Sequence, residues 1–248
     1  YTDILAKFPK NQRAASRYLQ FKKEMQQNQR ISNEAPRESL LEVLGLYNAK
    51  KLQDAVSKTT KLLEYYPKSY LLWNILGASN HEQKNYKDAE EAFTVVVKLN
   101  PEAAEGFFVL GNAQRKQNKL GDALISLERA VQLDPKHSNA WNNIGLVYRA
   151  NGKHKKALLA IRTAININSK NPEFWNNYGN TLANVGDFDA AAKSYEQAID
   201  LQPNNGKSYR QLALIKSYKL TEKQIVGMQN LYDSNVLSVE DLSHLCFA

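Results

Sequence analysis

The chain has 248 residues, of which 43% are hydrophobic and 23% are charged, and its formal net charge is +8. It has too many apolar residues for a disordered chain, and no stretch approaches the roughly 18 apolar residues of a membrane span. The single cysteine, Cys246, excludes a disulfide framework and a cysteine-rich metal site. With only 11 glycines and 7 prolines, the composition favours helices over a turn-rich β fold.

The first 30 residues carry most of the positive charge. Seven basic and two acidic residues leave +5 of the total there. A nucleic-acid-binding domain would show a basic stripe through its whole body, so we do not expect a nucleic acid as partner. Residues 1–35 are predicted to form a partial repeat that ends at Pro9, a basic helix over about 12–28, and a linker to Pro36.

From residue 36 the sequence repeats every 34 residues. Glycines, alanines, prolines and large aromatic residues each recur at this interval. The glycines are Gly77, Gly111, Gly145 and Gly179, and the alanines are Ala55, Ala89, Ala123, Ala157 and Ala191. The prolines are Pro67, Pro101, Pro135 and Pro203, and the aromatic residues are Trp73, Phe107, Trp141 and Trp175. Such a period is typical of a protein built from one stacked structural unit.

Each unit is interpreted as two amphipathic helices joined by a short turn. The glycine and the alanine allow the two helices to approach closely, and the proline ends the second helix. Because one helix pair cannot bury its apolar face alone, neighbouring pairs must stack. We therefore predict an all-α fold, a right-handed α-solenoid of antiparallel helix pairs. It contains five units, at 36–69, 70–103, 104–137, 138–171 and 172–205, of which the first is degenerate in its first helix.

The repeated residues resemble those of the tetratricopeptide repeat. The Trp-x2-Leu-Gly pattern stands at Trp73, Leu76 and Gly77, and the later alanine and proline positions also match. The resemblance covers residues 36–205. It implies a superhelix whose first helices line a concave surface, and a function in binding other proteins.

Residues 206–248 are predicted to form additional helices that cap the repeats. Thr221 and Gln224 have the spacing of a capping box, and a second helix is expected to start at Ser238. Since that helix stops on apolar residues, we expect the natural chain to continue. This segment resembles the one that joins repeats to the catalytic half of bacterial sulfotransferase-like proteins. That resemblance implies a sulfotransferase domain beyond Ala248.

Known catalytic and cofactor motifs are absent from the sequence. There is no glycine-rich phosphate loop, and the four histidines have no His or Cys partner at helical spacing. Asp187 and Asp189 fall at a turn between helices, where we expect a helix cap rather than a metal site. We predict no cofactor, no metal and no enzymatic activity for this chain.

The resemblance to tetratricopeptide repeats also implies which residues face a partner. Positions five, nine and twelve of the first helix point into the concave surface. The candidate partner-binding residues are Asn74, Phe108, Asn142 and Asn176 at position five, Asn112 and Asn180 at position nine, and His81, Arg115 and Arg149 at position twelve. The three tryptophans are expected in the core.

Two interpretations of the asparagines stay open. Asn inside a helix costs roughly 0.6 kcal/mol relative to Ala, so some contact must offset that cost. The amides of Asn142 and Asn176 either grip the backbone of an extended peptide, as in the asparagine ladder of O-linked N-acetylglucosamine transferase, or they bond neighbouring helices. For Asn143 and Asn177 we favour the bond between helices.

The arginines have two interpretations as well. Arg115 and Arg149 either meet a carboxylate of a partner or are ordinary surface charges. The family's clamp for a chain terminus needs Lys at position five, which no unit has, so we do not expect that clamp.

The sequence as a whole predicts a cytoplasmic scaffold that binds a protein or peptide in extended conformation, without a membrane or nucleic acid as partner. One alternative is the substrate-recognition arm of a sulfotransferase. Another is a structural module that forms a homo-oligomer through its terminal helices.

Overall fold

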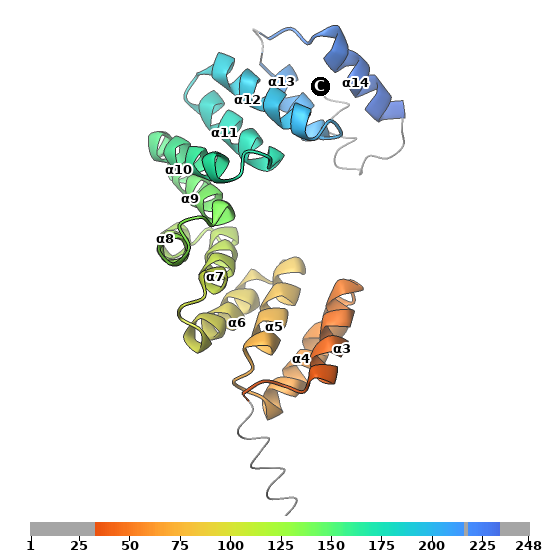
Figure 1. Ribbon diagram of the computed structural model, residues 1–248, viewed down its shortest axis with the longest axis vertical. Coiled ribbons are helices and arrows are strands. Elements are labelled where there is room, and N and C mark those ends of the chain that lie inside the picture. The colour runs from red at the N-terminus through yellow and green to blue at the C-terminus, as the bar shows by residue number, and fades with distance from the viewer. Residues whose placement is uncertain (1–32, 216–217, 234–248) are drawn as a thin grey trace, which may run out of the picture. The chain divides into compact units, whose positions relative to one another are not determined.

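The computed structural model describes residues 33–215 and 218–233, and this part of the chain is all-α (Figure 1). It contains helices and turns but no strand, as predicted. The predicted helix over 12–28, the predicted helix at Ser238 and the side chain of Cys246 lie outside the described residues.

The helices alternate between the first and the second helix of each repeat. We call the first ones A helices: α3 (Arg37–Asn48), α5 (Tyr70–Glu82), α7 (Ala104–Lys116), α9 (Ser138–Ala150) and α11 (Pro172–Asn184). The B helices are α4 (Leu52–Tyr65), α6 (Tyr86–Leu99), α8 (Leu120–Leu133), α10 (His154–Ile167) and α12 (Phe188–Leu201). They are followed by α13 (Gly206–Ala213) and α14 (Glu222–Asp233).

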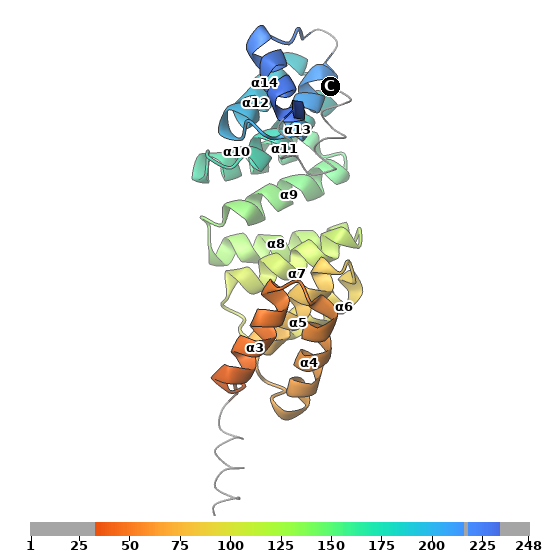
Figure 2. The same ribbon diagram turned by 90° about the vertical axis from the view of Figure 1, so that its right-hand side faces the viewer.

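The chain divides into two compact units, Tyr1–Asn100 and Pro101–Ala248. The described helices of the first unit are α3 to α6, and those of the second are α7 to α14. Within each unit an A helix packs on its own B helix and on the B helix before it. Figure 2 shows this for α9, which lies between α8 and α10. Consecutive A helices also touch, α3 with α5 and α9 with α11.

The contact between A and B helices depends on the repeated small residues. A Cβ atom on Gly179 would lie 2.6 Å from the Tyr195 ring of the paired B helix, and one on Gly111 would lie 2.7 Å from Leu127. Gly77 and Gly145 stand equally close to Phe93 and Ile161. The repeated alanines of the B helices are completely buried. Small residues at these points therefore let the two backbones approach, as the spacing predicted.

The tryptophans hold the turn before three of the A helices, α5, α9 and α11. Each is half-buried rather than fully in the core, and its indole N–H donates to a backbone carbonyl six residues earlier. The pairs are Trp73 with Pro67 (2.9 Å), Trp141 with Pro135 (3.0 Å) and Trp175 with Ser169 (2.8 Å). Because the acceptor is a backbone group, Ser can replace Pro without loss of this bond.

A further period of 34 residues, which sequence analysis missed, stands in the turn between A and B helices. The second residue after each A helix has a positive φ: Lys50 (58°), Lys84 (65°), Asn118 (62°), Gly152 (70°) and Gly186 (84°). Residues other than Gly and Asn rarely adopt this left-handed conformation, because it is sterically unfavourable for them. The two lysines are therefore held in a strained backbone conformation.

The last described helices extend the second unit. Tyr209 and Leu212 of α13 are buried against residues of α12, among them Tyr195 and Ile199. The predicted capping box of α14 is confirmed, since Thr221 N donates to Gln224 Oε1 (2.8 Å) and Gln224 N donates to Thr221 Oγ1 (3.3 Å).

The turn residues give a first prediction. Gly186→Ala should lower the free energy of unfolding by about 1 kcal/mol, because the left-handed conformation disfavours Ala. No atom stands within 4 Å of the added Cβ, so the effect is conformational alone. Lys84→Gly should raise stability by about 0.5 kcal/mol, because relief of the strain exceeds the entropy that Gly adds to the unfolded chain. Urea unfolding followed by circular dichroism measures both changes.

The matched control is Gly45→Ala, within helix α3, where an added Cβ also meets no atom. There the same substitution should stabilise by about 0.5–1 kcal/mol, since Ala is the better helix former. A shift of the same sign at Gly45 and Gly186 would contradict the account.

Candidate functional site

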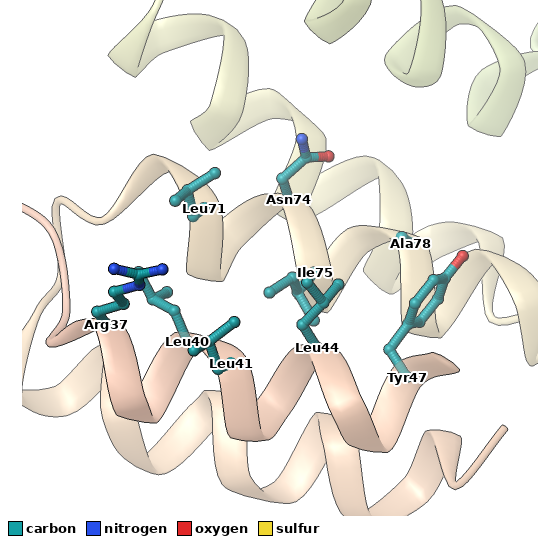
Figure 3. Close-up of a pocket in the computed structure, with 9 residues that line it drawn as sticks. All are labelled: Arg37, Leu40, Leu41, Leu44, Tyr47, Leu71, Asn74, Ile75 and Ala78. Atoms are coloured by element: carbon teal, nitrogen blue, oxygen red, sulfur yellow. The ribbon is translucent and has the colours of Figure 1, made fainter. Parts of the chain in front are cut away.

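An open apolar groove lies between the first two A helices, in the first unit (Figure 3). Its volume is about 480 Å³. Three leucines in its walls are unusually exposed for such large apolar side chains: Leu41 (55%), Leu44 (41%) and Leu71 (46%). We call this the leucine groove. The residues that line it are Arg37, Leu40, Leu41, Leu44 and Tyr47 of α3, and Leu71, Asn74, Ile75 and Ala78 of α5.

One end of the leucine groove is fixed by a polar link between the two helices. The Tyr47 hydroxyl donates to Glu82 Oε1 at 2.7 Å, and Lys50 Nζ contacts Glu82 Oε2 at 2.7 Å. Burial, together with the Glu82 carboxylate, raises the pKa of Tyr47 to about 12. The bonds from Lys50 and Tyr47 lower the pKa of Glu82. Lys50 is largely exposed, so its ion pair adds little stability, and the link mainly orients Tyr47.

Asn74 is the predicted site residue that lines this groove. Its side chain is half-buried, and within the described part of the chain it has no hydrogen-bond partner. A carboxamide can donate two hydrogen bonds and accept two, so its capacity is available to a ligand. His81, one turn beyond the groove, is packed edge-on against Tyr86 of α6 with ring centroids 5.3 Å apart.

Asn142 and Asn176, at the same repeat position in the second unit, are in a different situation. Each is only 3% exposed. Asn177 Nδ2 donates to Asn142 Oδ1 (3.1 Å), which joins α11 to α9, and Ser208 Oγ donates to Asn176 Oδ1 (3.0 Å), which joins α13 to α11. Asn142 Nδ2 also lies 3.5 Å from Asn143 Oδ1.

Both amides are therefore buried between repeats. Of the two interpretations left open by the sequence, the contacts favour the bond between helices. Losing one partner of a buried hydrogen bond costs about 1–3 kcal/mol, which outweighs the intrinsic cost of Asn in a helix.

Arg115 and Arg149 lie in the second unit together with Asn112, Asn180 and Tyr195, and the side chains of both arginines are half-buried. Arg115 donates to Asn112 Oδ1 at 3.0 Å, and Arg149 donates to the Asn177 carbonyl at 3.4 Å. Tyr195 donates its hydroxyl to Asn180 Oδ1 at 2.9 Å. Burial raises the pKa of Tyr195 to about 12, against the opposite effect of Arg149.

Phe108 packs within the repeats of the second unit. Its ring lies 4.7 Å from the ring of His137, between centroids. His137 Nδ1 accepts from Ala140 N (3.2 Å) and its Nε2 lies 3.1 Å from Glu105 Oε2, so this histidine caps α9 and contacts α7. Phe108 is half-buried and supports this contact.

The leucine groove was missed by sequence reasoning. The first repeat departs from the pattern, with Val43 where others have Gly, and no partner surface was expected there. A signal was present nonetheless. Leu40 and Val43 form the buried stripe of α3, while Leu41 and Leu44 form a second apolar stripe beside it. A helix that is apolar on more than its core face indicates a further contact surface.

Metal and membrane contacts were not expected from the sequence. Among the described side chains, no group of three or more His, Cys, Asp or Glu could hold a metal ion. Asp187 accepts from the Ala190 amide at 3.2 Å and so caps α12, as predicted. None of the described helices combines the length and the apolar character that crossing a membrane requires.

Comparison with known protein families agrees with the repeat pattern. A family model described as tetratricopeptide repeat matches residues 40–104 and 108–176, and a second model of the same description matches 172–205. The chain belongs to the tetratricopeptide repeat family. No curated protein sequence matches it.

Several solved structures share this tetratricopeptide repeat fold. A structure of MamA is 25% identical with a TM-score of 0.58, and the match covers 64% of this chain and 92% of that one. YrrB, described as a tetratricopeptide repeat protein with an unusual peptide-binding site, is 21% identical with a TM-score of 0.59, covering 76% and 95%. The pilF protein of Pseudomonas aeruginosa is 19% identical with a TM-score of 0.67, covering 85% and 96%.

These comparisons support the tetratricopeptide repeats and the solenoid fold. They give no support to the resemblance to sulfotransferase-like proteins, since the matching family models describe repeats only.

The two kinds of asparagine give a second prediction. Asn142→Ala should lower the free energy of unfolding by about 1–3 kcal/mol, because it leaves the buried Asn177 amide without its acceptor. Asn74→Ala should leave stability unchanged or raise it slightly, since no intramolecular bond is lost and Ala is the better helix former. Thermal and urea unfolding of the two variants measure the difference. Equal melting temperatures would contradict the assignment of Asn142 to the packing between repeats.

Proposed function

We propose that this tetratricopeptide repeat protein is a scaffold that binds a polypeptide segment in extended conformation, and that the leucine groove receives its apolar side chains. The observation that carries the proposal is the combination of three exposed leucines with the unpartnered Asn74 amide in one groove. Apolar walls with a few well-placed polar groups are typical of ligand sites.

The chemistry of the groove favours a polypeptide over other ligands. The Leu41, Leu44 and Leu71 side chains offer apolar contact without direction, whereas the Asn74 amide can both donate to and accept from a peptide bond. An extended chain alternates its side chains, so the ones that face the groove can be apolar while the others stay in water. Arg37 is the only cation that lines the groove within the described structure, which does not fit a nucleic-acid backbone.

The other predicted site residues have a smaller part in this proposal. Asn112 and Asn180 are half-buried and could still meet a partner, whereas Asn142 and Asn176 act in packing. The peptide-binding site described for YrrB belongs to that protein, and the likeness of YrrB to this chain concerns the fold. A cytoplasmic location is part of the proposal and rests on the sequence alone.

The third prediction tests the groove with peptides selected from a random display library. Selected peptides should have apolar residues at alternate positions. The double variant Leu41→Gln, Leu44→Gln should weaken their binding about tenfold or more, because it removes apolar contact area, and Asn74→Ala should weaken it about fivefold. Fluorescence polarisation with labelled peptides measures the dissociation constants.

The matched control is Leu159→Gln on the B helix α10, where the leucine is 66% exposed and does not line the groove. It should leave peptide binding unchanged. Peptides that bind the groove variants as tightly as the unmodified chain would refute the proposal. A second result would refute it as well. If light scattering at two concentrations shows a homodimer, and the Leu41→Gln, Leu44→Gln variant is a monomer, then the groove serves self-association.

The alternative of a sulfotransferase substrate arm gives a fourth prediction. Residues 1–248 should transfer no sulfonate group from a phosphosulfate donor to any acceptor, because catalysis would belong to a separate domain. A radiolabelled transfer assay checks this, and turnover by this chain would contradict the non-catalytic assignment.

A further inference from the structure

A second open pocket, of about 670 Å³, lies in the second unit between the last B helix, α12, and helix α14 (Figure 1). None of its described lining residues belongs to an A helix. Its polar lining groups include Glu196, Asp200, Tyr209, Gln224 and Asn230. Two of these are carboxylates, and no lysine or arginine is among the described residues that line the pocket. We call it the acidic pocket.

The acidic pocket contains a tyrosine whose hydroxyl is unused. Tyr209 is only 3% exposed, yet its hydroxyl has no hydrogen-bond partner within the described chain. A Cβ atom on Gly227 would lie 2.9 Å from the hydroxyl oxygen, so this group stands at the α14 wall of the pocket. Since buried polar groups normally have a hydrogen-bond partner, an unbonded hydroxyl at the end of a buried side chain points to a ligand in the pocket.

The repeat pattern shows how Tyr209 comes to lack a partner. It occupies the repeat position of the three tryptophans, 34 residues after Trp175. Each tryptophan donates its N–H to the backbone carbonyl six residues earlier, and the corresponding residue for Tyr209 is Pro203. The described chain has no such bond between Tyr209 and Pro203, and both residues line the pocket. The contact that closes the turn in three earlier repeats is therefore left open here.

Asp200 carries a charge that its own helix disfavours. It stands in the last turn of α12, where the helix dipole is unfavourable to an anion, and four residues after Glu196, a like charge on the same face. It has no hydrogen bond or ion pair within the described chain. Burial and then the charge of Asp200 raise the pKa of Tyr209, so the carboxylate lies near the unbonded hydroxyl.

Glu196 holds the wall of the acidic pocket in place. Its Oε1 accepts from the Tyr218 hydroxyl at 2.5 Å, and Tyr218 accepts from Gln224 Nε2 at 2.9 Å, which ties the start of α14 to α12. Glu196 Oε2 has no bond within the described chain. The pocket therefore presents acceptor oxygens and negative charge, in a chain whose formal net charge is +8.

We propose that the acidic pocket binds an organic cation with N–H donors, an ammonium or a guanidinium group. The Asp200 carboxylate pairs with the charge, and the Tyr209 hydroxyl accepts a further N–H bond. A bound cation also relieves the repulsion between Asp200 and Glu196. Because the chain as a whole is positive, its overall charge does not attract such a ligand. The pocket belongs to the second unit, so this inference does not depend on the leucine groove.

The cation can come from a basic side chain of a polypeptide or from a free polyamine, and four probes distinguish the two sources. Three are peptides of sequence Ser-Gly-X-Gly-Ser with both ends blocked, where X is Arg, Lys or Gln, and the fourth is spermidine. Isothermal titration calorimetry with the whole chain measures each affinity. The Arg or the Lys peptide should bind at least tenfold more tightly than the Gln peptide if the source is a side chain. Binding of spermidine alone would assign the pocket to free amines.

Two variants test the residues that carry the inference. Asp200→Asn should weaken binding of the preferred cation about tenfold or more, while the melting temperature stays unchanged or rises, because an unpaired charge in the last turn of a helix is removed. Tyr209→Phe should weaken binding about fivefold with an unchanged melting temperature, since no bond within the described chain is lost. It is also the second variant should Asp200→Asn fail to fold.

The matched control is Asp189→Asn, an exposed residue of the same helix that does not line the pocket and whose loss changes the net charge equally. Equal weakening by Asp189→Asn and Asp200→Asn would show a general charge effect and overturn the pocket. It would also be overturned if neither spermidine nor a basic peptide binds better than the Gln peptide, or if Asp200→Asn lowers the melting temperature without changing affinity. Leu41→Gln, Leu44→Gln should leave these affinities unchanged, so failure of the groove and failure of the pocket are distinguishable.

Discussion

The whole arrangement depends on one close contact, that of a glycine in the A helices α5, α7, α9 and α11 with a large side chain of the paired B helix. Gly179 touches the Tyr195 ring so closely that even one methyl group would clash, and Gly111 does the same with Leu127. Because backbones at this separation leave little freedom of orientation, the pairs at these glycines are built alike. The side chains on the remaining face of the A helices are not constrained by this contact, so they can differ between repeats.

The 34-residue period predicted the fold because each repeated residue makes a contact that the packing of the helix pairs requires. It could not predict the left-handed turn, since that requirement concerns the backbone and is met by Lys84, Asn118 and Gly152 alike. The tryptophans were recognised as structural, but the use of their N–H groups depends on where the preceding turn passes. Trp175 bonds the carbonyl of Ser169 as well as other tryptophans bond those of prolines, so residue identity carries no signal for this bond.

The position of a residue within the repeat indicates which way its side chain points, but not whether that side chain is available to a partner. Asn74 and Asn142 share position five, yet only Asn142 is bonded by the following repeat, through Asn177. Asn177 follows Asn142 by 35 residues in the sequence. The residue at the same spacing after Asn74 is Val109, whose side chain has no hydrogen-bond donor. Whether an amide is hydrogen-bonded within the protein can therefore be predicted only from pairs of repeats, because the neighbouring repeat supplies or lacks the bonding partner.

The leucine groove would act through apolar area, whose contribution to binding is insensitive to salt and mainly slows dissociation. The Asn74 amide would add direction, because a carboxamide can both donate and accept hydrogen bonds. A polypeptide held in this way would bind through apolar residues at alternate positions, and its affinity would change little between low and physiological salt.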